Sequence, residues 1–554
     1  MVSLTKRKIK GNIYWYAVKT ERVNGQPRIV WQQYLGTAEK ITNCIVQRGS
    51  AESIKLKTMP LGQVAALARA NEELRFVDII DKHTKKKDVG GLSVGQYLLI
   101  QLMGRAEGAL SRNAIAEWYP GSVTKLLIHT THEMNAKNLL KHLDYPTDDV
   151  IRAIEDDIST RLIELGLKPS MLLWDTTNFF TRIDHGGTIP QKGYSKDNRN
   201  DRNLIGVGLA VSSENVPFFH ETFEANEHDS KVFSNVLDTI VERLRKLKID
   251  AEEVVMVLDK GNNSDENIGA VVERTHIIGT LRYDQAEDYI GIPLKEFEPI
   301  DETEDKDALL AYRTKGVHYG NEFTIVVTYN PRTHRKQQAK FEEDKARIIK
   351  ELAAHKVRIE KRGGRGRRWT QTRAIRAIVD IIPLNMRSVF RYDVSKKVGR
   401  GGGLIMTFGI DTKKEEQRYR SFGKIVHFTD LHERSSKEIS MGYNSRYQVE
   451  DDFRWLKDKL LVPIKPVYVR TDDHIRSHVF ICIMGLLFYR YLQWRLRKAG
   501  IDLSTQELAK VLDDIRLAII KKGQARGGKV VVEEMERLSA RIFSILDMGE
   551  FIKA

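Results

Sequence analysis

The stretch from Tyr443 to Lys457 constrains the fold most, because two different stripes repeat along it at helical spacing. The apolar stripe consists of Val449, Phe453, Leu456 and Leu460. The polar stripe beside it consists of Tyr443, Arg446, Glu450 and Lys457. Polar groups at the edge of a core are costly to desolvate unless they contact something charged. The pattern predicts a helix that packs on a core and presents Glu450 to a metal ion or a phosphate. The plainer interpretation is an exposed helix with an Arg446/Glu450 ion pair.

The net charge narrows the class of partner. Across 554 residues the chain has 90 Lys and Arg against 75 Asp and Glu, a formal charge of +15. Basic residues spread along a long chain favour a polyanion, nucleic acid first, over a small acidic substrate. The most apolar run, Val479 to Leu492, is shorter than a bilayer span and contains Gly485 and Arg490. This run predicts a buried core helix and no membrane partner.

Cysteine usage favours a reducing compartment. Cys44 and Cys482 are far apart and lie in no Cys/His cluster, so neither a disulfide framework nor a structural zinc site is expected. The basic residues 1–11 lack the apolar run that a secretory signal needs.

The N-terminal third shows two patterns of apolar residues, one typical of strands and one typical of helices. Residues 12–36 alternate apolar and polar around Asn24-Gly25, which predicts a β-hairpin. From Val64 to about Leu165 the spacing becomes helical. Within it, Ser111 to Trp118 fits either the second half of a helix-turn-helix or a plain bundle helix.

Short apolar runs after Ser170 predict buried strands. They are Met171 to Trp174, Leu204 to Val211 and Val216 to Phe219, the last two forming a hairpin, and then Val254 to Leu258 after a helix. The first and last runs are followed by Asp175 and Asp259. An acid at the carboxyl end of a buried strand lies where open sheets bind ligands, although a single one can merely cap the next turn.

The 190 residues between Asp259 and Glu450 (450 − 259 − 1) are too many for a loop and predict a structure of their own. A hairpin is expected over Tyr312 to Thr328, turning at Gly320-Asn321, and an amphipathic helix through Phe341, Ile348 and Leu352. The basic run Lys361 to Arg368 ends beside Trp369. Arg365, Arg367 and Arg368 with Trp369 suit a DNA backbone and a stacked base, or equally a solvated linker.

The chain is expected to return to the core at Lys424 to Phe428 and to end in helices. One amphipathic helix is expected through Leu508, Val511, Ile515 and Ile519, and another through Met535, Leu538, Ile542 and Ile545.

Asp175, Asp259 and Glu450 together suit metal-ion chemistry on phosphodiesters. Three carboxylates in one cleft can hold two divalent ions about 4 Å apart. Mg²⁺ prefers such oxygen ligands, and Mn²⁺ is expected to substitute for it. Arg446 and Lys457 would then neutralise nearby phosphates, and Tyr443 would hydrogen-bond a phosphate or stack on a base.

These residues resemble a known family. Tyr443-x2-Arg446-x3-Glu450-x6-Lys457 is similar to the signature of the DDE transposases of bacterial insertion sequences, in the insertion-sequence-four superfamily and nearest its sixteen-thirty-four family. Further similar stretches are Trp174 to Thr177, Gly193 to Asp197 with Arg199 and Asp201, Leu258 to Gly261 with Ser264, and Phe422 to Lys424 leading into Phe428 to Asp430. The resemblance covers about residues 90–500.

The resemblance implies a mixed α/β fold with an RNase H-like core interrupted by a largely β insertion, between helical N- and C-terminal regions. The implied division is a hairpin module (1–60), a helical DNA-binding region (61–168), the first part of the core (169–280), the insertion domain (281–421), the second part of the core (422–472) and a helical region (473–554).

The implied activity is cut-and-paste transposition by a homodimer that binds double-stranded DNA, both the terminal inverted repeats and the target. Excision through a hairpin intermediate, with a flipped base held by Trp369 or Trp174, is part of this expectation. The implied location is the prokaryotic cytoplasm, associated with the nucleoid. Two alternatives stay open: an RNase H-fold nuclease or resolvase without strand transfer, and a catalytically silent DNA-binding protein.

Overall fold

The computed structural model describes residues 2–23, 26–47, 54–86, 91–184, 187–197, 199–227, 229–300, 307–361, 369–396, 403–457, 461–522 and 528–552. About 49% of the chain is helical and about 25% lies in strands, with a large mixed sheet, so the predicted mixed α/β class is confirmed. The chain divides into two compact units. Unit 1 comprises Met1–Val254 and Arg446–Ala554, and unit 2 comprises Val255–Ser445.

Unit 1 begins with an antiparallel sheet. Its strands are β1 (Val2–Ile9), β2 (Asn12–Val23) and β3 (Gln26–Gly36), and α1 (Ala38–Gln47) follows. Tyr34 packs beside Tyr14 and Tyr16 across β2 and β3. The predicted hairpin is confirmed, whereas its Asn24-Gly25 turn lies outside the described residues.

A second sheet joins the two ends of the chain within unit 1. β16 (Arg516–Lys522) pairs with β4 (Ile54–Pro60) on one side and with β17 (Lys529–Val532) on the other. The C-terminal region was expected to be helical, and this is wrong in part. α18 (Thr505–Asp513) and α19 (Arg537–Ile545) form, but Ile519 lies in β16 instead of extending α18. The β-branched pair Ile519-Ile520 suits a strand, and β4 supplies its partner.

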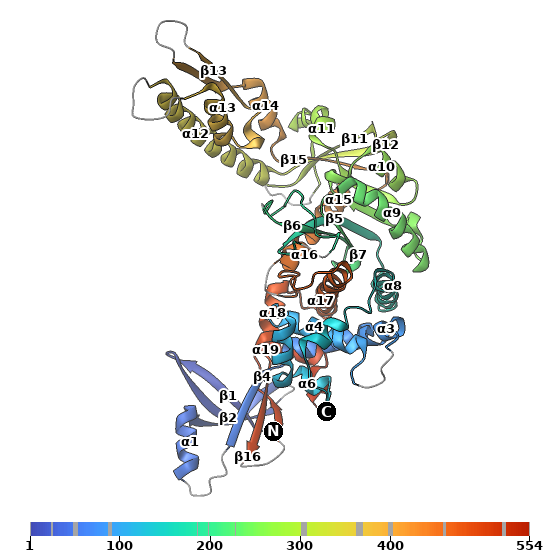
Figure 1. The fold of residues 1–554 in the computed structure, drawn as a ribbon, viewed down its shortest axis with the longest axis vertical. Coiled ribbons are helices and arrows are strands. Elements are labelled where there is room, and N and C mark those ends of the chain that lie inside the picture. Colours follow the sequence, from blue (N-terminus) through green and yellow to red (C-terminus); the bar gives the residue numbers. More distant parts are fainter. Residues whose placement is uncertain are drawn as a thin grey trace. The chain divides into compact units, whose positions relative to one another are not determined.

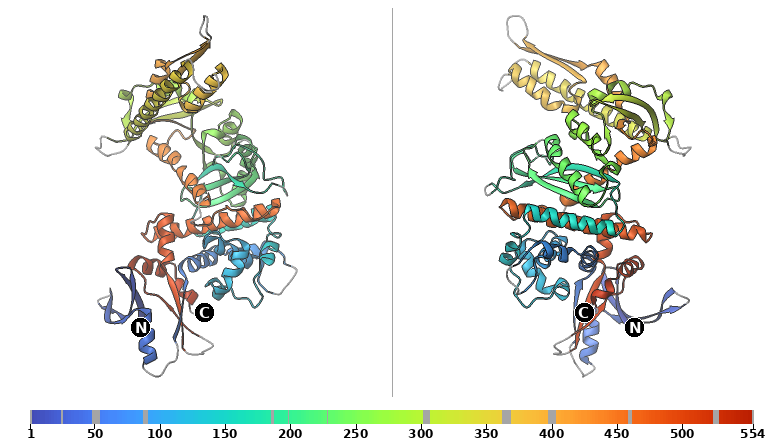
Figure 2. Two further views of the ribbon diagram at one scale, coloured as in Figure 1. Left: turned by 60° about the vertical axis from the view of Figure 1, so that its left-hand side comes forward. Right: turned by 90° about the vertical axis from the view of Figure 1, so that its right-hand side faces the viewer.

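The helical layer of unit 1 packs around one long helix, α17 (Asp472–Lys498). The other members are α2 (Gly62–Leu74), α3 (Phe76–His83), α4 (Val94–Ala106), α5 (Arg112–Trp118), α6 (Thr124–Leu127), α7 (Ala136–Lys141) and α8 (Asp148–Glu164). α17 contacts α2, α4 and α8, and Figure 2 shows α8 and α17 side by side. The helical pattern over residues 64–165 is thus confirmed.

α17 is the one helix in the described ranges that is long and apolar enough, by length and composition alone, to cross a membrane. However, 94% of its apolar window is buried within the structure. The predicted core helix around Val479 to Leu492 is therefore confirmed.

Unit 1 also contains an antiparallel set of three strands. They are β5 (Met171–Thr181), β6 (Asn203–Ser212) and β7 (Pro217–Glu224), followed by α9 (Asp229–Lys246). The predicted strands, hairpin and helix are confirmed. Asp175 does not end its strand, however, because β5 continues to Thr181, which pairs with Asn203 of β6. Thr176, Thr177 and Phe179 are buried residues with high strand propensity, so pairing continues past the acid.

Six of the described strands of unit 2 pair in one series. β8 (Val255–Leu258) and β9 (His276–Thr280) run parallel, and β9 then pairs antiparallel with β15 (Lys424–Thr429). The antiparallel series continues through β12 (Asn321–Tyr329), β11 (Leu310–His318) and β10 (Glu298–Pro299). Unit 2 also contains α10 (Asp265–Val272), α11 (Tyr283–Ile290) and α15 (Ser436–Asn444). These elements confirm three predictions: the buried strand that follows α9, which is β8, the hairpin at Gly320-Asn321, and the strand by which the chain returns to the core, which is β15.

The rest of unit 2 packs around its own core, which helices dominate (Figure 1). Its elements are α12 (Pro331–Glu360), α13 (Gln371–Ile381), β13 (Phe390–Lys396), β14 (Leu404–Ile410) and α14 (Thr412–Ser421). The prediction that residues 281–421 are largely β is therefore wrong. From Arg332 to Glu360 the chain contains no Gly or Pro and many Ala, Glu, Lys and Arg residues, all strong helix formers. The β11–β12 hairpin also joins the sheet of the return strand instead of standing apart.

Candidate active site

The polar stripe from Tyr443 to Lys457 is divided between two helices instead of lying on one. α15 ends at Asn444, and α16 (Tyr447–Lys457) begins three residues later. The Ser445 hydroxyl donates to the Gly442 carbonyl (2.5 Å), a local bond of the kind that competes with a continuous helix. Tyr443 thus belongs to unit 2, and Arg446, Glu450 and Lys457 belong to unit 1.

α16 packs on β5, the strand that contains the first predicted metal ligand, and on its neighbour β6. Val449, Phe453 and Leu456 are buried, as the apolar stripe predicts, whereas Leu460 lies outside the described residues. α16 contacts β5, β6 and α17. Glu450, in its first turn, is therefore carried by a helix that lies against the strand of Asp175.

Asp175 and Asp259 occupy different settings. Asp175 is half-buried in β5 opposite Leu209, and its Oδ1 accepts a hydrogen bond from the Thr176 amide (2.8 Å). Asp259 belongs to unit 2 and directly follows β8, as predicted. It precedes a 3₁₀ turn, Lys260–Asn262, but its side chain does not cap that turn. The turn-capping interpretation of Asp259 is therefore wrong.

Glu450 is exposed and paired with its helical neighbour. Arg446 Nη2 lies 2.7 Å from Glu450 Oε1, and the Glu450 side chain is 55% exposed. This is the i,i+4 ion pair of the plainer interpretation. The pair is therefore confirmed, and as a surface pair it contributes between 0 and about 1 kcal/mol.

Lys457 contacts an acid from the segment that resembles the family between Gly193 and Asp197. Asp197 accepts from Lys457 Nζ through Oδ1 (2.8 Å) and from Lys465 Nζ through Oδ2 (3.2 Å). Burial alone would raise the pKa of Asp197, but the hydrogen bonds and charges of the two lysines hold it below its usual range. Phe179 and Phe180 of β5 lie under the two ammonium groups, 5.7 Å from Lys457 and 4.3 Å from Lys465. One carboxylate thus sits between two cations, where a phosphate could also bind.

Tyr443 is buried in unit 2, with 9% of its surface exposed. Its hydroxyl accepts a hydrogen bond from Thr280 Oγ1 (3.0 Å), and its ring meets His427 edge to face. Burial lowers the pKa of His427 to about 3, so this neighbour is neutral near pH 7. A role for Tyr443 toward a phosphate stays a prediction.

The aromatic candidates for base stacking are both engaged in packing. Trp174 is fully buried beside Phe233, so ordinary strand packing accounts for it. Trp369 is partly buried against the core of α12 and α13, with the Arg373 guanidinium 4.5 Å from its ring centre. Arg365, Arg367 and Arg368 lie outside the described residues.

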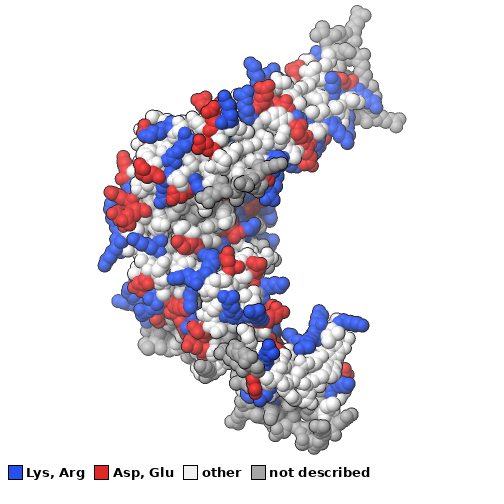
Figure 3. Space-filling model, turned by 180° about the vertical axis from the view of Figure 1, so that it is seen from behind, with Lys and Arg blue, Asp and Glu red and all other residues white. Residues whose placement is uncertain are grey.

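Across the described residues, no group of three or more His, Cys, Asp or Glu side chains is placed to hold a metal ion. Unit 1 carries Asp175 and Glu450, and unit 2 carries Asp259. The two-metal site therefore stays a prediction. On the face seen in Figure 3, basic and acidic side chains are interspersed instead of forming one basic patch.

Comparison with protein-family models and with curated proteins finds no match to the chain.

Sequence reasoning missed the contact between Asp197 and the two lysines. The acid lies in a segment that resembles the family, but no spacing rule connects it to Lys457, 260 residues later. Lys465 lies in an irregular stretch after α16 and has no sequence signal of its own.

Proposed function

We propose that the chain is a DDE-type DNA transposase that cuts and rejoins DNA by metal-dependent phosphodiester chemistry. The observation that carries the proposal is the packing of α16 on β5 in unit 1. This packing brings the helix of Glu450 and Lys457 onto the strand of Asp175, with Asp197 already bonded to Lys457. Several residues that resemble the family's motifs in the sequence thus lie on secondary-structure elements that pack together.

The order of elements supports an RNase H-like core. Three antiparallel strands, β5 to β7, are followed along the chain by α9, β8, α10 and β9, and β8 and β9 run parallel. This is the order expected of such a core. The region between Asp259 and Glu450 contains a separate hydrophobic core around α12 and α13, as expected of an insertion.

Asp175, Asp259 and Glu450 would hold two Mg²⁺ ions, or Mn²⁺ in their place, through carboxylate oxygens. The bound ions would activate a water or a 3′-hydroxyl and stabilise the leaving oxygen. Glu450 suits this role because its side chain is 55% exposed and its one ion pair among the described residues is a surface pair with Arg446. Such a pair can exchange its partner at little cost.

Arg446 and Lys457 would bind phosphates beside the reacting bond. Each is now bonded to a carboxylate, Arg446 to Glu450 and Lys457 to Asp197. A phosphate that displaces Asp197 would keep both Lys457 and Lys465 neutralised. The partners in this proposal are double-stranded terminal repeats and target DNA bound by a homodimer, in a prokaryotic cytoplasm.

The deciding experiment incubates the purified chain and Mg²⁺ with duplex DNA that carries the ends flanking its own gene. Double-strand breaks with hairpinned ends and joined products are expected. Cleavage without joined products would indicate a nuclease or resolvase, and binding without cleavage would indicate a DNA-binding protein.

Glu450→Gln is expected to abolish cleavage while leaving DNA binding largely intact. Glu242→Gln is the matched control, because Glu242 is also an exposed helical residue of unit 1 paired at i,i+4 with a cation, Lys246. Equal cleavage by both variants would refute the assignment of Glu450.

A further inference from the structure

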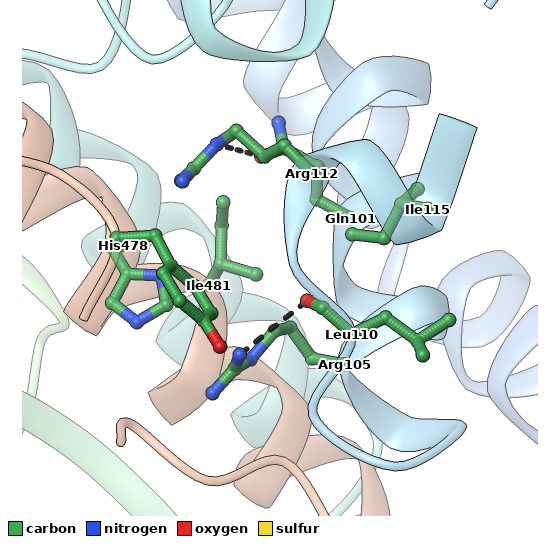
Figure 4. Close-up of a pocket in the computed structure, with 8 residues that line it drawn as sticks. Gln101, Arg105, Leu110, Arg112, Ile115, His478 and Ile481 are labelled. Carbon is green, nitrogen blue, oxygen red and sulfur yellow. Dashed lines mark hydrogen bonds between the residues drawn. The ribbon is translucent and has the colours of Figure 1, made fainter. Parts of the chain in front are cut away.

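A small pocket in unit 1 contains positive charge that no acid among the described residues neutralises. It lies between α4, α5 and α17 and is lined by Gln101, Arg105, Leu110, Arg112, Ile115, Tyr468, His478 and Ile481. In Figure 4, Arg105 and Arg112 lie on opposite sides of this space, with His478 between them. None of the described residues that line it is Asp or Glu.

Arg105 differs from the other deeply buried arginines. In the described part of the chain three arginines are buried, namely Arg105, Arg243 and Arg490. Arg243 contacts Glu155 and Asp156, and Arg490 contacts Asp451 and Asp452. Such pairing is the usual condition for burying a charge.

Within the part of the chain that the structure describes, the partners of Arg105 are all neutral. Its guanidinium donates to the carbonyls of Ala109 (3.1 Å), Leu110 (3.5 Å), Pro463 and Lys465 (3.2 Å). Its Nε is buried without any hydrogen-bond partner. Carbonyls satisfy donors but supply no net negative charge, so the cation stays uncompensated.

Arg112 adds a second cation to the same pocket. Its Nε donates to Gln101 Oε1 (3.0 Å), and its terminal amino groups have no hydrogen-bond partner within the described ranges. Burial and the charge of Arg105 lower the pKa of Arg112 to about 10, so it remains charged near pH 7. The pocket therefore holds two positive charges.

His478 does not change this balance. Its Nε2 donates to the Ile464 carbonyl (2.9 Å). Burial and the charges of Arg105 and Arg112 hold the pKa of His478 well below its usual range, so the ring is neutral.

The size of the pocket limits what can enter. Its volume is about 10 Å³, roughly that of one water-sized group. Tyr468 lines it and is 55% exposed, so the pocket reaches solvent there. One oxygen of a larger anion fits, with the rest of that anion outside.

The geometry points to an anion site at Arg105 and Arg112 that takes one oxygen of a phosphate group presented from solvent. The phosphate is either inorganic or part of a DNA backbone. The second source rests on the proposed function, since α5 would then be fixed on the DNA at a point distinct from the acidic residues. Lys465 links this pocket to the candidate active site, because its carbonyl accepts from Arg105 while its side chain donates to Asp197.

The first arm of the test uses the full chain and inorganic phosphate, without DNA. A saturable rise in Tm of about 2 °C over chloride at equal ionic strength is expected. Arg112→Gln should lose this rise and Arg112→Lys should keep most of it. Arg75→Gln, an exposed arginine outside the pocket, should behave as the unchanged chain. A rise of equal size in Arg112→Gln would overturn the proposal.

The second arm measures binding of duplex DNA against salt. If the phosphate belongs to DNA, Arg112→Gln should weaken binding and lower the log-log salt slope by about 0.9, with Arg75→Gln unchanged. If phosphate raises the Tm but Arg112→Gln leaves DNA binding and its salt slope unchanged, the ligand is inorganic phosphate. If the chain binds no DNA, the proposed function fails while the first arm still decides the pocket. If Arg112→Gln keeps both the rise in Tm with phosphate and the DNA binding of the unchanged chain, the proposed site is wrong.

Discussion

Arg490 is a buried residue of α17 and Arg105 is a buried residue of α4, which packs on α17, yet their surroundings differ in charge. Arg490 contacts Asp452 through Nε (2.6 Å) and Asp451 through Nη2 (3.1 Å), and Nη1 donates to Gln493 (3.0 Å) and Thr505 (2.8 Å). Arg105 donates to four backbone carbonyls and also contacts the neutral Cys482 thiol, and no Asp or Glu among the described residues pairs with it. A buried arginine that is paired with acids holds neighbouring elements in contact. A buried arginine without an acid keeps an unpaid desolvation cost, which binding of an anion would lower.

The difference teaches how to separate structural from binding charge in a strongly basic chain. A net charge of +15 favours a polyanionic partner but does not say where it binds. Counting lysines and arginines would weight Arg490 and Arg105 equally. Their partners, and not their number, distinguish them.

The largest effect is expected from removing Arg490. Arg490→Met leaves Asp452 fully buried and without its cation, and it also removes the shared partner of Gln493 and Thr505. We expect the free energy of unfolding to fall by about 3–5 kcal/mol, as for other buried ion pairs broken from one side. Urea denaturation followed by circular dichroism measures it. A loss below about 1 kcal/mol would show that the ion pairs of Arg490 do not stabilise the fold, and the contrast with Arg105 would then fail.

The pH dependence of the same cluster should be the next largest effect. Burial raises the pKa of Asp452 to about 6, although Arg490 opposes the shift. Between pH 6 and about 4 the folded state therefore holds a proton that the unfolded chain releases, so the contribution of this group to stability grows as the pH falls. Relative to Asp452→Asn, the unchanged chain should gain on the order of 2 kcal/mol from pH 7 to pH 4. Parallel stability curves for the two proteins would show that Asp452 does not titrate in this range.

The elements that sequence could predict are those whose pattern is local. The buried strands β5, β6 and β8, the hairpin at Gly320-Asn321 and the core helix α17 follow from runs and turns a few residues long. β16 could not be predicted, because its helical spacing is overridden by pairing with β4, more than 450 residues earlier in the chain. The break between α15 and α16 also escaped prediction, because the polar stripe keeps its helical spacing across residues 445 and 446.

The candidate site divides in the same way. Asp259 was placed correctly after its strand, and Glu450 on a helix with a buried apolar face. Asp175 was expected at a strand end and lies within β5. The contacts of Asp197 with Lys457 and Lys465, and the pocket of Arg105 and Arg112, depend on tertiary packing that no local spacing encodes.

A smaller effect of opposite sign is expected at Arg112. Arg112→Met removes one of two uncompensated cations, so without phosphate or DNA the chain should be equally stable or more stable by up to about 1 kcal/mol. Urea denaturation in phosphate-free buffer measures this change. A destabilisation approaching that of Arg490→Met would show that Arg112 is a structural tie, and the contrast between the two arginine sites would disappear.

The smallest change in stability should come from the ion pair on the surface of α16. Glu450→Gln removes a carboxylate that is 55% exposed and bonded to Arg446 at i,i+4, so the free energy of unfolding should change by less than about 0.5 kcal/mol. Glu242→Gln, with its own exposed i,i+4 pair to Lys246, should change it by a similar amount. The two variants are expected to differ only in DNA cleavage. A loss above about 2 kcal/mol for Glu450→Gln alone would mean that this glutamate, like Asp452, acts in folding, and its exposure would then need another explanation than chemistry on DNA.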